Sequence, residues 1–173
     1  MIDVKKLIED HLKSTKLDIL VFGPAVDPPS KDPHVASLQV KRKDIKQTLI
    51  DEGHSAAFGE DVVNSTLPAP ISDPLLQEIV AMRAADLIIV LVGAPGAIFE
   101  AATIAREKEL CGKAQFYCFE DHKDGLVVRH LQYMSAHGAT CRLVSLAEVQ
   151  ACKLKAVVLE KVRAVQVGKA FLF

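Results

Sequence analysis

Tryptophan is absent from this 173-residue chain, and aromatic residues make up only 5% of it. So few aromatic side chains provide no stacking platform for the bases of a nucleic acid. An excess of charge of either sign is also lacking, because 21 basic and 22 acidic residues leave a net charge of -1. Nucleic acids and anionic membranes attract basic surfaces, so we expect neither as a partner.

Cysteine is scarce, and its four positions are far apart and form no C-x-x-C pair: Cys111, Cys118, Cys141 and Cys152. The six histidines show no metal-ligand spacing, so we expect no metal site and no cofactor. The phosphate-binding G-x-x-x-x-G-K-[ST] loop and the hydrolase G-x-S-x-G turn are both missing. The first residues lack the apolar core of a signal peptide, and we therefore expect a cytoplasmic protein with reduced thiols.

Apolar segments typical of strands alternate with amphipathic segments typical of helices along the whole chain. Half of the residues are hydrophobic and a quarter are charged, which suits one globular domain over residues 1–173. The alternation predicts an α/β fold with a single doubly wound, five-stranded parallel sheet in the flavodoxin-like order 2-1-3-4-5. Strands are expected at 17–23, 54–58, 87–92, 114–119 and 140–144, and helices at 2–14, 35–52, 73–85, 96–105, 125–137 and 145–166.

The most informative stretch runs from residue 87 to residue 105. A β-branched apolar run leads into a turn at 93–96 and then into an Ala-rich helix, and the only charged residue among them is Glu100. The turn excludes a membrane-spanning helix and predicts a strand buried on both faces. Glu100 is interpreted in two ways: as a first-turn carboxylate that stabilises the helix dipole, or as a reactive carboxylate at the ligand-binding edge of the sheet.

The order 2-1-3-4-5 places a ligand cleft between the first and third strands, at their carboxyl ends. We expect Glu60 and Asp61 to close one side of this cleft, and Asp73 to be either a helix cap or a site residue. The run 41–43, Lys-Arg-Lys, is expected to be a solvated helix face, with a phosphate contact as the alternative. Backbone groups for substrate binding are expected at Gly23, Pro24, Gly93, Pro95 and Gly96.

Several short motifs occur together: Ala85-Asp-Leu-Ile-Ile-Val-Leu91, Pro95-Gly96, Glu100 with Ala105, the strand end Phe22-Gly-Pro24, and Asp73. In these motifs the sequence resembles the nucleoside 2-deoxyribosyltransferase-like superfamily. The resemblance implies that Glu100 attacks the anomeric carbon of a nucleoside or nucleotide, and that Asp73 helps to hold the sugar or base. Ala94 departs from the family pattern, in which an aspartate precedes the turn.

Two other functions remain open from the sequence. Toll/interleukin-receptor-like domains also use a single glutamate on a flavodoxin-like sheet, so this second resemblance implies hydrolysis of NAD. A non-catalytic module that binds or senses nucleotides would use the same cleft. Because the chain ends in apolar Phe171-Leu-Phe173, we also expect it to form a homo-oligomer that covers this tail.

Overall fold

The computed structural model describes residues 3–65, 73–93, 95–122 and 126–171. Its sheet is entirely parallel and has the order β2-β1-β3-β4-β5, which confirms the predicted fold class and strand order. The central strand, β3, pairs with β1 through Ile19–Leu87 and with β4 through Ile88–Ala114. The strands are β1 (Asp18–Phe22), β2 (Ser55–Phe58), β3 (Leu87–Val92), β4 (Ala114–Phe119) and β5 (Thr140–Val144).

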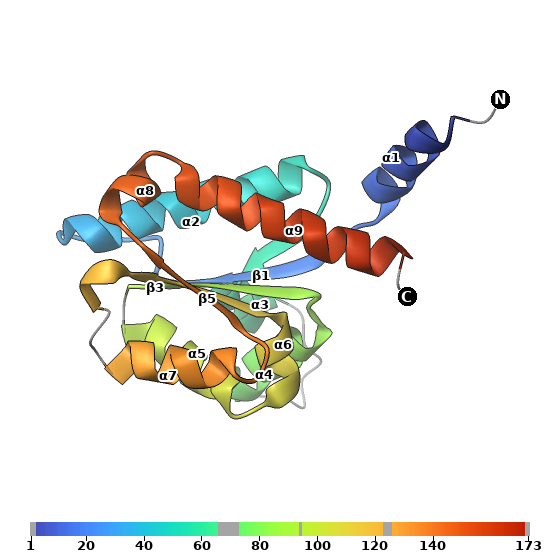
Figure 1. Ribbon diagram of the computed structural model, residues 1–173. Coiled ribbons are helices and arrows are strands. Elements are labelled where there is room, and N and C mark those ends of the chain that lie inside the picture. Colours follow the sequence, from blue (N-terminus) through green and yellow to red (C-terminus); the bar gives the residue numbers. More distant parts are fainter. Residues whose placement is uncertain (1–2, 66–72, 94, 123–125, 172–173) are drawn as a thin grey trace.

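Helices cover both faces of the sheet, as Figure 1 shows. One face carries α2 (Pro33–Asp51), α8 (Leu146–Gln150) and α9 (Lys153–Phe171). The other carries α3 (Gly59–Ser65), α4 (Pro74–Ala84), α5 (Pro95–Ala105), α6 (Lys108–Lys113) and α7 (Leu126–Ser135). The helix α1 (Val4–Ser14) extends away from both layers (Figure 1). Within the described ranges, no helix combines the length and apolar composition needed to cross a membrane.

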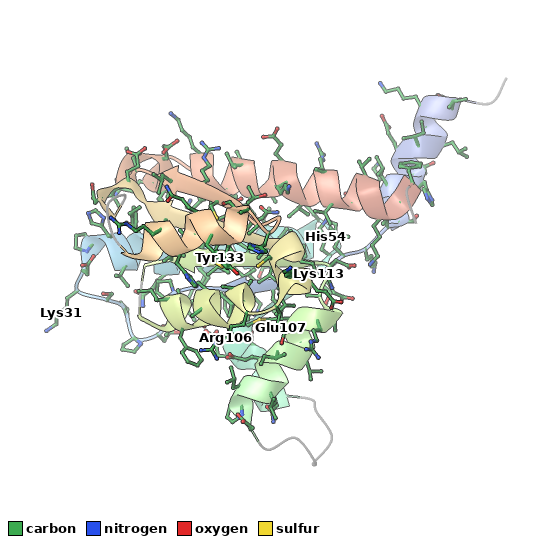
Figure 2. All side chains as sticks on the ribbon, turned by 60° about the horizontal axis from the view of Figure 1, so that its bottom comes forward. Lys31, His54, Arg106, Glu107, Lys113 and Tyr133 are labelled. Carbon is green, nitrogen blue, oxygen red and sulfur yellow. The ribbon has the colours of Figure 1, made fainter. Side chains whose placement is uncertain are left out.

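Strand β3 is buried along its whole length because its alternate side chains enter two separate cores. Leu87, Ile89 and Leu91 pack with α2 and α9, whereas Ile88 and Val90 pack with α4 to α7. The continuous apolar run at 87–92 therefore folds as predicted, with a helical layer on each side. On the second face, Glu107 and Lys113 attach α6 to the end of α4 (Figure 2): Glu107 pairs with Arg83, and Lys113 donates to the Arg83 and Ala85 carbonyls.

Three expectations about individual elements were wrong. The last helix is divided, because Cys152 takes a φ of 60° between α8 and α9 where no glycine or proline signals a break. Residues 59–65, which belong to none of the expected helices and strands, form the helix α3, and residues 66–72 lie outside the described part of the chain. The Lys-Arg-Lys run is also not a solvated face, because Lys41 is 6% exposed and Arg42 only 1%.

Candidate functional site

Glu100 occupies a core-facing position of α5. Ala97, Ala101 and Ile104 on this helix are fully buried against the sheet. Together with Glu100 they follow the spacing i, i+3, i+4 and i+7, which places four side chains on one face of a helix. A carboxylate therefore stands in an otherwise apolar stripe. It lies in the second turn of α5, so the expectation of a first-turn dipole carboxylate was wrong.

The environment of Glu100 favours its protonated form. Its Oε2 atom is buried and has no hydrogen-bond partner among the described residues. Burial, followed by the negative charges of Glu78 and Glu60, raises the pKa of Glu100 to about 7, although Arg42 acts in the opposite direction. The carboxyl group is consequently near half ionisation at neutral pH, where it can act as a nucleophile or exchange a proton.

Arg42 extends from α2 under the carboxyl end of β1. Its Nε and Nη2 atoms donate to the Val21 carbonyl at 3.2 and 2.8 Å, and Nη1 donates to the carbonyls of Gly23 and Pro24 at 3.2 and 3.0 Å. Both Nη atoms also reach the carboxylate of Glu60, at 2.8 and 2.5 Å. This forked ion pair fixes the backbone after β1 and joins it to the start of α3.

Glu60 pairs with this guanidinium, Glu100 interacts electrostatically with Arg42, and Glu78 interacts electrostatically with Glu60 and Glu100. We call Arg42, Glu60, Glu78 and Glu100 the carboxylate cluster. Glu60 comes from the start of α3 and Glu78 from α4, so the cluster draws on four helices. Burial and the charge of Glu60 raise the pKa of Glu78 as well. An excess of acidic over basic groups in a partly buried region keeps some carboxyls protonated near neutral pH.

Close backbone approach explains two of the expected site glycines. A Cβ atom at Gly23 would lie 3.1 Å from Cβ and 3.2 Å from the carbonyl oxygen of Leu91, and one at Gly93 would overlap Leu38. The same added atom at Gly93 would be 3.8 Å from Pro24 Cγ, so Gly23, Pro24 and Gly93 are brought together at the edge between β1 and β3. Gly96 differs: it is exposed, and no described atom beyond its two chain neighbours and its own helix backbone lies within 4 Å of its added Cβ.

The remaining predicted site residues have structural contacts of their own. Asp61 accepts hydrogen bonds from Lys46 at 2.6 Å and from the Phe58 N–H at 3.2 Å. Partial burial raises the pKa of Asp61, but these bonds and the charges of Lys46 and Arg42 lower it by more, so it lies below its ordinary value. Asp73 is exposed and caps α4 by accepting from the Leu75 N–H at 2.9 Å, as the capping alternative predicted. Pro95 begins α5, and Ala94 lies outside the described residues.

Sequence reasoning missed Arg42 and Glu78. Arg42 was assigned to a charged run, although it follows Leu38 by four residues and precedes Ile45 by three, and both of these are buried. That spacing already placed Arg42 on the inward face of α2. Glu78 gave no comparable signal, because its importance depends on the packing of α4 beside α3 and on its electrostatic interaction with Glu100.

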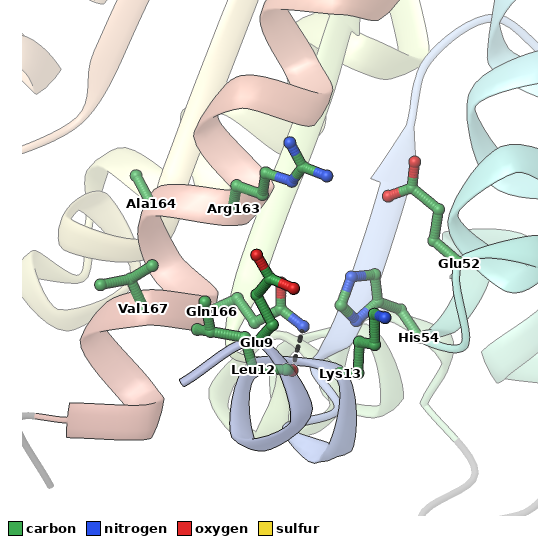
Figure 3. Close-up of a pocket in the computed structure, with 9 residues that line it drawn as sticks. All are labelled: Glu9, Leu12, Lys13, Glu52, His54, Arg163, Ala164, Gln166 and Val167. Carbon is green, nitrogen blue, oxygen red and sulfur yellow. Dashed lines mark hydrogen bonds between the residues drawn. The ribbon is translucent and has the colours of Figure 1, made fainter. Parts of the chain in front are cut away.

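A cavity of about 640 Å³ lies at the opposite, amino-terminal edge of the sheet (Figure 3). Its walls come from α1, α9 and the connection between α2 and β2, and include Glu9, Arg163 and His54. His54 accepts from the Leu17 N–H at 3.3 Å, and burial lowers the pKa of this histidine. No three candidate metal ligands gather anywhere in the part of the chain that the structure describes.

No protein-family model matches the sequence, and no curated protein matches it either. The resemblance to deoxyribosyltransferase-like enzymes therefore depends on the motifs quoted above and on the position of Glu100.

Proposed function

We propose that this protein cleaves or transfers the N-glycosidic bond of a nucleoside or nucleotide, with Glu100 as the nucleophile. The observation that carries the proposal is a carboxyl group in an apolar stripe at the carboxyl edge of the sheet, with one oxygen unpartnered among the described residues. A carboxylate of this kind costs free energy to retain, and such residues concentrate at catalytic sites.

The reaction divides into two balanced steps. An oxygen of ionised Glu100 bonds to the anomeric carbon as the bond from that carbon to the base nitrogen breaks, and the base leaves with the electron pair and takes up a proton. Water, or the nitrogen of a second base, then attacks the anomeric carbon, releases the Glu100 carboxylate and gives up its proton to the group that protonated the first base. Both transition states resemble an oxocarbenium ion, which nearby negative charge stabilises.

Neighbouring side chains supply two further requirements of this chemistry. Burial raises the pKa of Glu78, and its charge raises the pKa of Glu100, so the two carboxyls titrate as a pair. When Glu100 is the ionised member, the proton held by Glu78 is available to the leaving base. Phe99 is adjacent in sequence and 58% exposed, and its ring offers a flat apolar surface for a nucleobase. Asp73 remains the family-derived candidate for holding the sugar.

The test is a panel of nucleosides, their 5′-monophosphates and NAD, with release or exchange of the base followed by chromatography. We expect turnover of at least one nucleoside or nucleotide, and a fall of at least about 10²–10⁴-fold in the Glu100→Gln variant. The matched control is Glu109→Gln, because Glu109 is an exposed glutamate on the neighbouring helix α6.

The outcomes of this panel separate the alternatives. Turnover of NAD alone would establish the NAD-cleaving function instead. Binding without turnover of any compound would establish a nucleotide-sensing module, and wild-type turnover in Glu100→Gln would refute the nucleophile. The proposed enzyme works in the cytoplasm, needs no cofactor and forms a homo-oligomer, whose mass light scattering measures directly.

A further inference from the structure

The cavity at the amino-terminal edge of the sheet contains a buried donor for which the described residues offer no acceptor. His54 is only 7% exposed, and burial lowers its pKa despite the nearby charge of Glu52, so the ring is neutral at pH 7. Because Nδ1 accepts from the Leu17 N–H, the ring proton lies on Nε2. The ring points into the cavity (Figure 3), where Nε2–H is available to a ligand.

A second oriented polar group in the cavity wall comes from α9. The Gln166 amide nitrogen donates to the carbonyls of Leu12 and Thr15, at 2.7 and 2.9 Å. These two bonds fix the orientation of the amide, and its oxygen accepts from none of the described residues. The wall therefore presents one N–H donor and one C=O acceptor in fixed orientations. A few oriented polar groups in a cavity of about 640 Å³ are typical of a small-molecule site.

Four charged side chains of balanced sign surround this donor and acceptor (Figure 3). Glu9 and Lys13 come from α1, Glu52 from the end of α2 and Arg163 from α9. None of the four forms an ion pair with a described residue, although Glu9 precedes Lys13 by four positions on one face of α1. Two of these charges would repel any ligand of a single sign, whereas a zwitterion can pair with both signs.

The helix α1 supplies two of these charges but is weakly attached to the domain. It has no buried side chain, α9 is its main neighbour, and its apolar side, which includes Leu7, is exposed. An isolated helix of 11 residues is marginal in water. A ligand that contacts both α1 and the rest of the cavity wall therefore stabilises the docked position of this helix.

We propose that this cavity binds a free α-amino acid with an apolar side chain. The ligand carboxylate pairs with Arg163 and accepts from His54 Nε2–H, and the ammonium group pairs with Glu9 and donates to the Gln166 oxygen. The ligand side chain packs on the apolar part of the wall, to which Leu12, Ala164 and Val167 belong. The site lies at the edge of the sheet opposite the carboxylate cluster and does not depend on the proposed enzymatic function.

The test is calorimetric titration of the whole chain with L-leucine, L-methionine and L-phenylalanine. Each amino acid is compared with the amine that lacks its carboxylate and with the acid that lacks its ammonium group, which for leucine are 3-methylbutylamine and 4-methylpentanoate. We expect at least one amino acid to bind, and its two analogues to bind about 10-fold more weakly or worse, because each loses a charge-assisted hydrogen bond. Hydrogen exchange of the α1 amides should slow in the complex.

Variants at two exposed positions separate the two ionic contacts. Arg163→Gln should weaken binding of the amino acid about 10-fold without weakening that of the amine, and Glu9→Gln should weaken it similarly without weakening that of the acid. The matched controls are Arg106→Gln and Glu160→Gln, which change exposed residues outside the cavity wall and should bind the amino acid as the wild type does.

Three results would overturn the proposal. The first is no binding of any of the three amino acids at millimolar concentration. The second is binding of the acid analogue or of inorganic phosphate as tightly as the amino acid, which would establish an anion site instead. The third is undiminished binding by Arg163→Gln or Glu9→Gln, which would place the ligand elsewhere. Because none of these measurements uses a nucleoside, their failure is distinguishable from failure of the proposed function.

Discussion

Replacing Glu100 with glutamine should stabilise the fold at alkaline pH while it removes the proposed nucleophile. The substitution preserves the shape of the side chain but eliminates its ionisation. In the wild type, burial and the charges of Glu78 and Glu60 raise the pKa of Glu100 from 4.5 to about 7. The folded protein therefore binds more protons than the unfolded chain between these two values, and its stability falls as the pH rises through that window.

The size of the effect follows from the same two pKa values. The difference corresponds to about 3 kcal/mol once Glu100 is fully ionised, and most of it accumulates between pH 5 and pH 8. Glutamine has no such penalty. The advantage of Glu100→Gln over the wild type should consequently grow by roughly 2–3 kcal/mol between pH 5 and pH 8, which is about 5–10 °C in melting temperature for a protein of this size.

Urea unfolding at pH 5 and pH 8 measures this difference directly. Any unpaired amide that glutamine introduces costs the same at both pH values, so it cancels in the comparison. The control is again Glu109→Gln, for which the difference between the two pH values should equal that of the wild type. If the unfolding free energy of Glu100→Gln changes between pH 5 and pH 8 as much as that of the wild type, ionisation of Glu100 does not destabilise the fold. That result would refute the raised pKa of Glu100.

Three further perturbations test the site's construction. Glu78→Gln removes a negative neighbour of Glu100, so the pKa of Glu100 should fall and the acidic limb of the kcat/KM profile should move to lower pH. An unmoved limb would show that Glu78 does not influence the ionisation of Glu100. Arg42→Met should lower the free energy of unfolding, measured in urea, by about 3–5 kcal/mol, and adding Glu60→Gln to this variant should restore part of the loss. A loss under about 1 kcal/mol would contradict the role of the guanidinium. Gly93→Ala should lower the melting temperature through overlap with Leu38, at about 1–3 kcal/mol, whereas Gly96→Ala should be neutral or stabilising; equal effects would contradict the backbone packing.

The sheet could be predicted from the sequence because its signals are local. The apolar run at 87–92 and the alternation of strand and helix patterns predict a parallel sheet, and the structure has the predicted strand order. Glu100 was identifiable for a similar reason, since a single charge in an apolar stripe is visible in the sequence. The break at Cys152 could not be predicted, because a non-glycine residue with positive φ has no reliable local signature.

The rest of the carboxylate cluster depends on tertiary packing. Arg42 is held in the interior by one carbonyl of β1, two carbonyls just after β1, and the Glu60 carboxylate of α3. Nothing within the Lys-Arg-Lys run distinguishes it from the exposed Lys43 beside it, apart from the helical spacing to Leu38 and Ile45. The exposed face of α1 shows a related limit, because an amphipathic pattern indicates that a face becomes covered without indicating which surface covers it.

The central claim is that Glu100 bonds to the anomeric carbon. The most direct measurement is mass spectrometry of protein quenched in acid during turnover, followed by peptide mapping. The account predicts a peptide containing Glu100 whose mass is increased by one glycosyl group, and no adduct in Glu100→Gln. A glycosyl group on another residue, or wild-type turnover without any adduct on Glu100, would contradict it.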